Sequence, residues 1–230
     1  MTIHLQREIE RLKKDILRLS AVVEEGFQRA VKSLEERDGY TAQLVMESDF
    51  EIDKMEVEIE EECLKILALY QPVAVDLRFI VAVLKINNDL ERIGDLAVNI
   101  AERAAFLATQ ERINIPFDFS GMAQKAKSML KRSLDALMKM DALLAREVCA
   151  SDDEVDDMNR EMYLQVQDGI RNQPEHLESL THVLSASRHL ERIADHATNI
   201  AEDVIYMIKG EIVRHRAEDY KSLPLGSRDK

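Results

Sequence analysis

Residues 89–103 read DLERIGDLAVNIAER, and residues 189–203, one hundred positions later, read HLERIADHATNIAED. Ten of these fifteen positions are identical, where unrelated segments would match at about one. A second match lies upstream, where Ser48, Asp49 and Asp53 correspond to Ser151, Asp152 and Asp156 at an offset of 103 residues. The chain therefore contains an internal duplication.

Helical periodicity surrounds both copies of the repeat. Apolar residues recur three or four positions apart, which predicts helices over about 3–36, 39–70 and 72–108, with Pro72 in the first turn of the third. The same pattern predicts a second set at about 121–139, 141–171 and 175–209, with a Gln-Pro pair again before the last helix. The predicted fold is all-α, with two pseudo-symmetric three-helix bundles.

Composition shifts suggest where the two bundles meet. The segment around Pro116 breaks the helical pattern and is typical of a linker. We therefore predict a first bundle over residues 1–110, a linker over 111–120, a second bundle over 121–210 and a C-terminal tail over 211–230.

Charge and hydropathy exclude several classes of partner. The chain has 44 acidic and 31 basic side chains, a net charge of −13 that repels nucleic acid and anionic membrane surfaces. Its longest apolar run, FIVAVL at residues 79–84, is far shorter than the roughly 20 residues that span a bilayer, and we expect neither a signal sequence nor membrane insertion. Cys63 and Cys149 lie in helical apolar patterns, which predicts core thiols in a reducing cytoplasm.

Acidic residues recur four positions apart at matching places in the two halves. Like charges at that spacing weaken a helix by about 0.2–0.5 kcal/mol, so a shared cation would explain their repetition. The sequence thus predicts one carboxylate metal site in each half. The candidate ligands are Asp49, Asp53, Glu91, Asp95, Asp152, Asp156, Glu191 and Asp195, and the adjoining polar face adds Asn99, Glu102, Asn199 and Glu202.

The ligand chemistry leaves the identity of the metal open. Carboxylate and amide oxygens suit Mg²⁺, Mn²⁺ and Ca²⁺, and they also hold bridged iron. The alternative is that the acids form an ordinary solvated helix surface. No Glu-x-x-His motif, phosphate-binding loop or nucleophile motif occurs, so no catalytic residue is predicted, and the six histidines are expected at the surface or as helix caps.

Four segments resemble the PhoU family, the accessory regulators of phosphate-specific transport. They are SDFEIDKME at 48–56, QPVAVDLR at 71–78, LERIGDLAVNIAE at 90–102 and its second copy. The resemblance implies a pair of three-helix bundles, with the family's E(D)-x-x-x-D metal motifs falling on the four acid pairs. The second half reads QPEHLESLTHV, so a role of Asp76 or Arg78 does not carry over to it.

The resemblance also implies a function. It points to a cytoplasmic adaptor without enzyme activity that represses phosphate uptake and the phosphate-starvation response. Its implied partners are the ATPase subunit of the phosphate ABC transporter and a sensor histidine kinase, and it implies a homodimer. Two rival readings remain open at this point, a metal-dependent phosphohydrolase and a metal-free helical scaffold.

Overall fold

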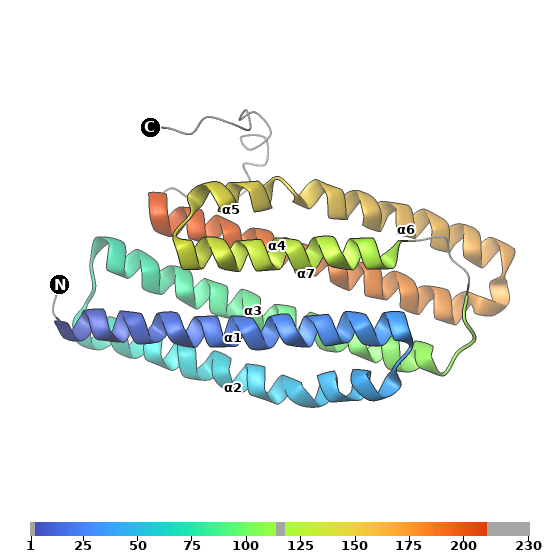
Figure 1. Ribbon diagram of the computed structural model, residues 1–230, viewed down its shortest axis with the longest axis horizontal. Helices are drawn as coiled ribbons and strands as arrows, with labels where there is room; N and C mark the ends of the chain where they lie inside the picture. Colours follow the sequence, from blue (N-terminus) through green and yellow to red (C-terminus); the bar gives the residue numbers. More distant parts are fainter. Residues whose placement is uncertain (1–2, 114–117, 211–230) are drawn as a thin grey trace.

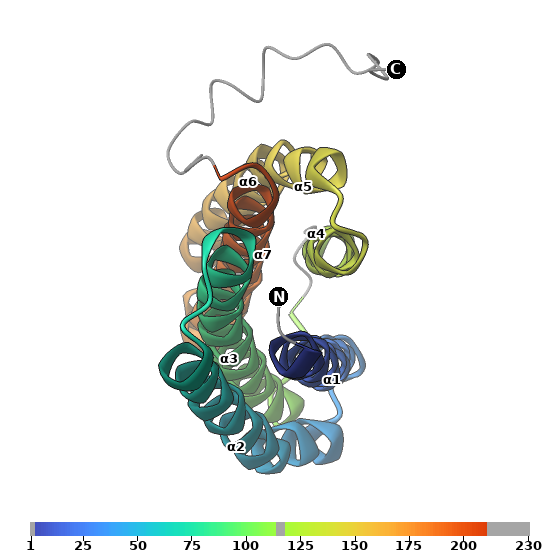
Figure 2. The ribbon, with the colours of Figure 1, turned by 90° about the vertical axis from the view of Figure 1, so that its left-hand side faces the viewer.

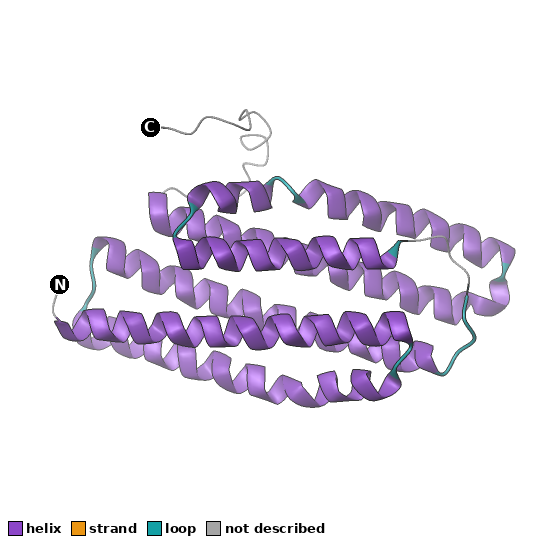
Figure 3. Cartoon of the chain, in the orientation of Figure 1, coloured by secondary structure: helices purple, strands orange, loops and turns teal. Residues whose placement is uncertain are grey.

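The computed structural model describes residues 3–113 and 118–210, and within them it contains helices and no strand (Figures 1 and 3). The first half consists of α1 (Ile3–Glu36), α2 (Gly39–Tyr70) and α3 (Ala74–Ala108). The second half consists of α4 (Phe119–Lys139), α5 (Ala142–Cys149), α6 (Asp152–Asn172), the short 3-10 helix η1 (Pro174–His176) and α7 (Leu177–Lys209). This confirms the predicted all-α fold with two related halves.

The domain limits proposed for the two bundles stay a prediction. Part of the predicted linker, residues 114–117, and the predicted tail, residues 211–230, lie outside the described residues. Within the described ranges, no helix is both long enough and apolar enough to cross a membrane.

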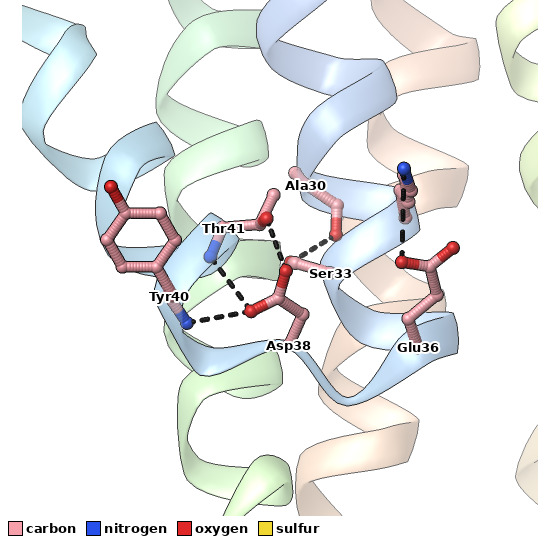
Figure 4. A network of polar contacts seen from close by, with 7 residues as sticks. Ala30, Ser33, Glu36, Asp38, Tyr40 and Thr41 are labelled. Atoms are coloured by element: carbon pink, nitrogen blue, oxygen red, sulfur yellow. Dashed lines mark hydrogen bonds and ion pairs between the residues drawn. The ribbon is translucent and has the colours of Figure 1, made fainter.

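The same turn begins the second helix of each half, α2 and α5. Asp38 accepts hydrogen bonds from the backbone N–H groups of Tyr40 and Thr41 (Figure 4). Asp141 accepts the equivalent bonds from Leu143 and Leu144. These carboxylates satisfy N–H groups that have no partner inside the helix. The turns therefore recur at the 103-residue offset found in the sequence.

The second half departs from the prediction at one point, because the expected helix over 141–171 is divided. The backbone N–H of Ser151 bonds to Val148 O at 2.9 Å, three residues back, and its hydroxyl bonds to Glu147 O at 2.8 Å. This tighter pattern interrupts the regular ladder between α5 and α6. The interruption places Asp152 in the first turn of α6, where a negative charge is favourable.

The third helix also begins later than predicted. Gln71 adopts a left-handed conformation with φ of 45°, and α3 starts at Ala74 rather than at Pro72. Val73 is extended, with φ of −127° and ψ of 160°, and precedes the first residue of α3, so Pro72 lies in the turn before the helix.

The core is continuous across the two halves. Viewed along the long axis, α3 and α7 lie side by side in the centre, with α1 and α2 on one side and α4, α5 and α6 on the other (Figure 2). Leu90 and Ile93 of α3 and their counterparts Leu190 and Ile193 of α7 are all fully buried. The repeated LERI segments therefore supply the centre of the core.

A compensating pair of side chains sets how closely α2 approaches α3. A Cβ atom added to Gly94 would lie 3.0 Å from Cδ1 and 3.2 Å from Cγ2 of Ile52, so the first half combines a glycine with a large neighbour. The repeat counterparts of Gly94 and Ile52 are Ala194 and Val155. The alanine is one methyl group larger than the glycine, and the valine is one carbon smaller than the isoleucine. The total volume is therefore conserved between the halves.

This compensation predicts non-additive stability. Ile52→Val alone should reduce the free energy of unfolding by about 0.5–1.5 kcal/mol, because it leaves a void. In a protein that already carries Gly94→Ala, Ile52→Val should lower the free energy of unfolding by less, or raise it, because the added methyl group fills the void. Urea unfolding of the two single variants and the double variant should give a coupling free energy of about 1 kcal/mol between the two substitutions. The matched control is Ile59→Val, which changes another buried residue of α2. Its effect on the free energy of unfolding should simply add to that of Gly94→Ala. Equal coupling of Gly94→Ala to Ile52→Val and to Ile59→Val would contradict a specific contact between positions 52 and 94.

Candidate metal centre

Four carboxylates of the second half come together where α6 begins beside α7. One oxygen from each of Asp156, Glu191 and Asp195 lies within 4.8 Å of the other two. Asp152 accepts a hydrogen bond of 3.2 Å from the Thr198 hydroxyl, and its charge adds to the desolvation that raises the pKa of Glu191 and Asp195. Three of the four predicted ligands of this half therefore lie close together, and the fourth, Asp152, interacts with two of them through its charge.

The equivalent carboxylates of the first half interact over longer distances. Among the described residues, the trio on α6 and α7 is the one group of three such ligands within 4.8 Å. Desolvation, followed by the charges of Asp53 and Asp95, still raises the pKa of Asp49. Desolvation, followed by the charges of Asp95, Glu56 and Asp53, likewise raises the pKa of Glu91. The first-half acids thus crowd one another electrostatically without closing into a tight trio.

One oxygen of the first-half site has no partner. Asp49 Oδ1 is buried and accepts no hydrogen bond from any described residue. Its counterpart Asp152 is bonded to Thr198, but the first half carries Val98 at the position equivalent to Thr198. A buried acceptor without a donor costs about 1–3 kcal/mol or more, and an oxygen of this kind suits a hard cation. The residues present therefore fit a metal ion.

The pKa of Asp195 is strongly raised by its surroundings. Its side chain reaches the surface, yet desolvation by the surrounding protein raises its pKa to about 7. The charges of Glu191, Asp152 and Asp156 contribute in the same direction, while His196 opposes them. Without a counterion, this group therefore retains a proton at pH values where an isolated aspartate is ionised.

The four additional polar residues make different contacts in the two halves. Asn99 donates to the backbone oxygen of Asp95 at 2.8 Å, and Glu102 pairs with Arg103 at 2.9 Å. Asn199 lies 3.5 Å from Asp89 Oδ1 on α3, and the charge of Glu202 adds to the burial that raises the pKa of Cys149 to about 12. Neither asparagine donates a hydrogen bond to the side chain of a clustered acid.

The contact between α3 and α7 contains polar pairs that the sequence analysis did not predict. His196 is nearly buried, and its Nδ1 lies 2.8 Å from Asp89 Oδ1. Lys85 Nζ lies 2.9 Å from Asp203 Oδ1, which is also buried. The expectation that every histidine lies at the surface or caps a helix was wrong for His196, because Asp89 of the other half supplies its partner.

Two more histidines of α7 are half-buried. The His182 ring stacks on Phe106 of α3 with centroids 3.8 Å apart. His189 shares a 3.2 Å hydrogen bond with the Ser185 hydroxyl, and burial, followed by the charge of Arg103, lowers its pKa to about 4. These rings therefore also belong to the contact between the halves.

A signal for these residues is present in the repeat. The fifteen-residue copies differ at five positions, which are Asp89 and His189, Gly94 and Ala194, Leu96 and His196, Val98 and Thr198, and Arg103 and Asp203. All five have a structural role in at least one copy, either between the halves or beside a carboxylate cluster. The positions that differ between the copies, and not the identical ones, therefore mark these residues.

Comparisons with known proteins agree with the duplicated helical fold. A family model described as the PhoU domain matches residues 16–104 and again 119–204. The chain is 37% identical over 212 residues to the phosphate-specific transport system accessory protein PhoU homolog of Aquifex aeolicus, covering 92% of this chain and 96% of that protein.

Two crystal structures share the fold. PhoU from Pseudomonas aeruginosa superposes with a TM-score of 0.86 at 36% identity, covering 90% of this chain and 99% of that one. The phosphate transport system regulatory protein PhoU from Streptococcus pneumoniae superposes with a TM-score of 0.85 at 29% identity, covering 91% and 99%.

The raised pKa of Asp195 predicts how stability depends on pH. Between about pH 4 and 7 the folded chain holds a proton that the unfolded chain releases, so stability from this group falls as pH rises through that window. In chelator-treated protein, Asp195→Asn should therefore gain stability relative to wild type between pH 5 and 8. The gain should reach about 1 kcal/mol, because water screens part of the interaction.

The measurement is urea unfolding at several pH values, with Asp157→Asn as the control. Asp157 is exposed on α6 and pairs with Arg160 outside the cluster. Its variant should follow the wild-type pH dependence. A constant difference between wild type and the Asp195 variant at all pH values would refute the assignment.

Proposed function

The chain belongs to the PhoU family, and from that premise we propose that it is an accessory regulator of a phosphate transport system. The names of its relatives support this reading, since they describe an accessory or a regulatory protein of phosphate transport. In this proposal the chain is an adaptor and not an enzyme. Its first partner is the ATPase subunit of the phosphate transporter.

The finer proposal concerns the direction of the regulation. We propose that the chain acts in the cytoplasm as a homodimer, links the transporter to a sensor histidine kinase, and represses phosphate uptake and the phosphate-starvation response when phosphate is plentiful. A continuous helical core suits this role, because a rigid body can present different surfaces to different partners. Its signal would be a shift in which partner it holds.

The observation that carries the metal part of the proposal is the close group of Asp156, Glu191 and Asp195. The mutual electrostatic effects of the equivalent first-half acids support it. Asp152, Asp156, Glu191 and Asp195 would hold a cation between α6 and α7, and Asp49, Asp53, Glu91 and Asp95 would do so between α2 and α3. A bound cation would supply positive charge that offsets their mutual repulsion. The residues would then hold each pair of helices together.

A metal-dependent phosphohydrolase is the rival from another class. Paired carboxylates are compatible with such an enzyme. Against it, the grooves between α1 and α2 and between α1 and α4 are lined by none of the eight carboxylates. Together with the absence of a repeated general acid or base beside the clusters, this favours the regulator; a metal-free scaffold is the remaining alternative.

The metal proposal predicts a loss of bound metal on removing one acid of each pair. The variant Asp49→Asn, Glu91→Gln, Asp152→Asn and Glu191→Gln keeps side-chain shape but removes four charges. Elemental analysis of protein purified without chelator should find metal in wild type and at least tenfold less in the variant. Adding a chelator should lower the thermal midpoint of wild type only.

A matched variant removes the same number of charges outside the clusters. Glu51→Gln, Glu58→Gln, Asp157→Asn and Glu161→Gln change exposed acids of α2 and α6, and this protein should retain its metal. Negligible metal in all three proteins would sink the metal proposal. Metal-dependent hydrolysis of p-nitrophenyl phosphate that disappears in the cluster variant would favour the enzyme instead.

The regulatory proposal predicts the phenotype of a gene disruption. In phosphate-rich medium the disrupted strain should produce alkaline phosphatase at several times the wild-type level, because repression is lost. The wild-type gene supplied in trans should restore repression, and the enzyme activity in cell extracts measures both effects. Full repression in the disrupted strain would remove the regulatory reading.

A further inference from the structure

The outer face of α2 carries large apolar side chains in water. The helix packs against α1 and α3 through a buried stripe on its opposite side. On the outer side, Phe50, Val57 and Leu64 follow one another at intervals of seven residues, with exposed fractions of 77%, 50% and 54%. Positions opposite the core are normally polar, so this outer stripe has no role in the fold of the single chain.

The duplication supplies an internal control for this stripe. At the 103-residue offset the counterparts of Phe50, Val57 and Leu64 are Asp153, Arg160 and Gln167 of α6. The second half builds the same kind of helix with polar residues at all three positions. The shared architecture therefore does not require apolar residues there.

Acidic side chains border the stripe on both sides. The helix carries nine acidic and two basic residues, and each basic residue is paired within the helix: Lys54 with Glu58 at 3.8 Å and Lys65 with Glu62 at 3.0 Å. At about 100° per residue, the exposed charged residues nearest the stripe are Asp53 and Glu60 on one side and Glu61, Lys54 and Glu47 on the other. The one basic residue among them, Lys54, is the one paired with Glu58. The stripe thus lies in a negative surround.

The charge decides what can cover this surface. A second copy docked through the same face would bring two acidic borders together, and an anionic membrane surface would also be repelled. A segment with basic residues beside its apolar ones would be attracted. Fourteen residues separate Phe50 from Leu64, about 21 Å of helix, which matches an amphipathic helix of about four turns.

We propose that the outer face of α2, centred on Phe50, Val57 and Leu64, binds an amphipathic helix of another protein that carries apolar residues at heptad spacing flanked by Lys or Arg. The inference goes beyond the phosphate function, because it follows from exposure and charge on one helix. It requires neither bound metal nor a particular signalling pathway.

The first test transfers the residues of α6 to α2. The variant Phe50→Asp, Val57→Arg and Leu64→Gln removes the three apolar side chains and leaves the net charge of the chain unchanged. The probe is a fluorescently labelled 18-residue helical peptide with leucines at heptad a and d positions and lysines beside them. Wild type should bind it, and the triple variant should bind at least tenfold more weakly by fluorescence anisotropy.

Controls separate this surface from general acidity. Tyr163→Ser with Leu164→Ser removes two exposed apolar residues of α6 and should bind the peptide within twofold of wild type. A peptide with glutamates in place of its lysines should not bind. Equal binding by wild type and the triple variant, or no binding by wild type, would overturn the proposal. Circular dichroism checks that each variant is folded, and Leu64→Gln alone, expected to weaken binding several-fold, serves if the triple variant is not.

The second test identifies the natural occupant. A photoreactive p-benzoylphenylalanine replaces Val57 in the full chain in cells, with replacement of Arg160 as the matched control. The cross-link from position 57 should map to a helix of another protein with basic residues beside an apolar stripe, and position 160 should not yield it. A cross-link to a second copy of the chain, to lipid or to an acidic segment would overturn the proposal.

Discussion

The contact between α3 and α7 is the constraint on which the rest of the structure depends. These two helices carry the repeated LERI segments, and their leucines and isoleucines are fully buried at the centre of a core that both halves share. Because every other long helix packs on one of these two, the register of the contact sets where the two carboxylate clusters lie relative to each other. The polar pairs across it, such as Asp89 with His196, are specific to one alignment of the helices.

The carboxylate clusters follow from that register and from the close approach of the helix beside each central one. Gly94 lets Ile52 come near α3 in the first half, and Val155 with Ala194 fills the same space in the second. The halves nevertheless differ chemically. Thr198 satisfies an oxygen of Asp152, while Val98 leaves Asp49 Oδ1 without a donor. Two copies of one motif therefore present clusters of different tightness.

The duplication also separates what the fold needs from what it does not. Apolar residues that are identical in both copies, such as Leu90 and Leu190, belong to the common core. Residues that differ mark either the contact between the halves or a surface that only one half carries. The exposed stripe of α2 and the polar residues at the same positions of α6 are an example of the second kind.

The sequence by itself determined the helical class, the duplication, the buried stripes and the four acid pairs, because all of these are periodic along a single helix or repeat at a constant offset. It did not predict the division between α5 and α6, which depends on the hydrogen bonds of Ser151, nor the burial of His196, which depends on a partner 107 residues away. Only the tertiary structure decided that Asp156, Glu191 and Asp195 form a tight group while the first-half acids stand apart. The reason is physical: spacing along a helix fixes which face a side chain occupies, but the distance between side chains on different helices depends on how closely those helices pack.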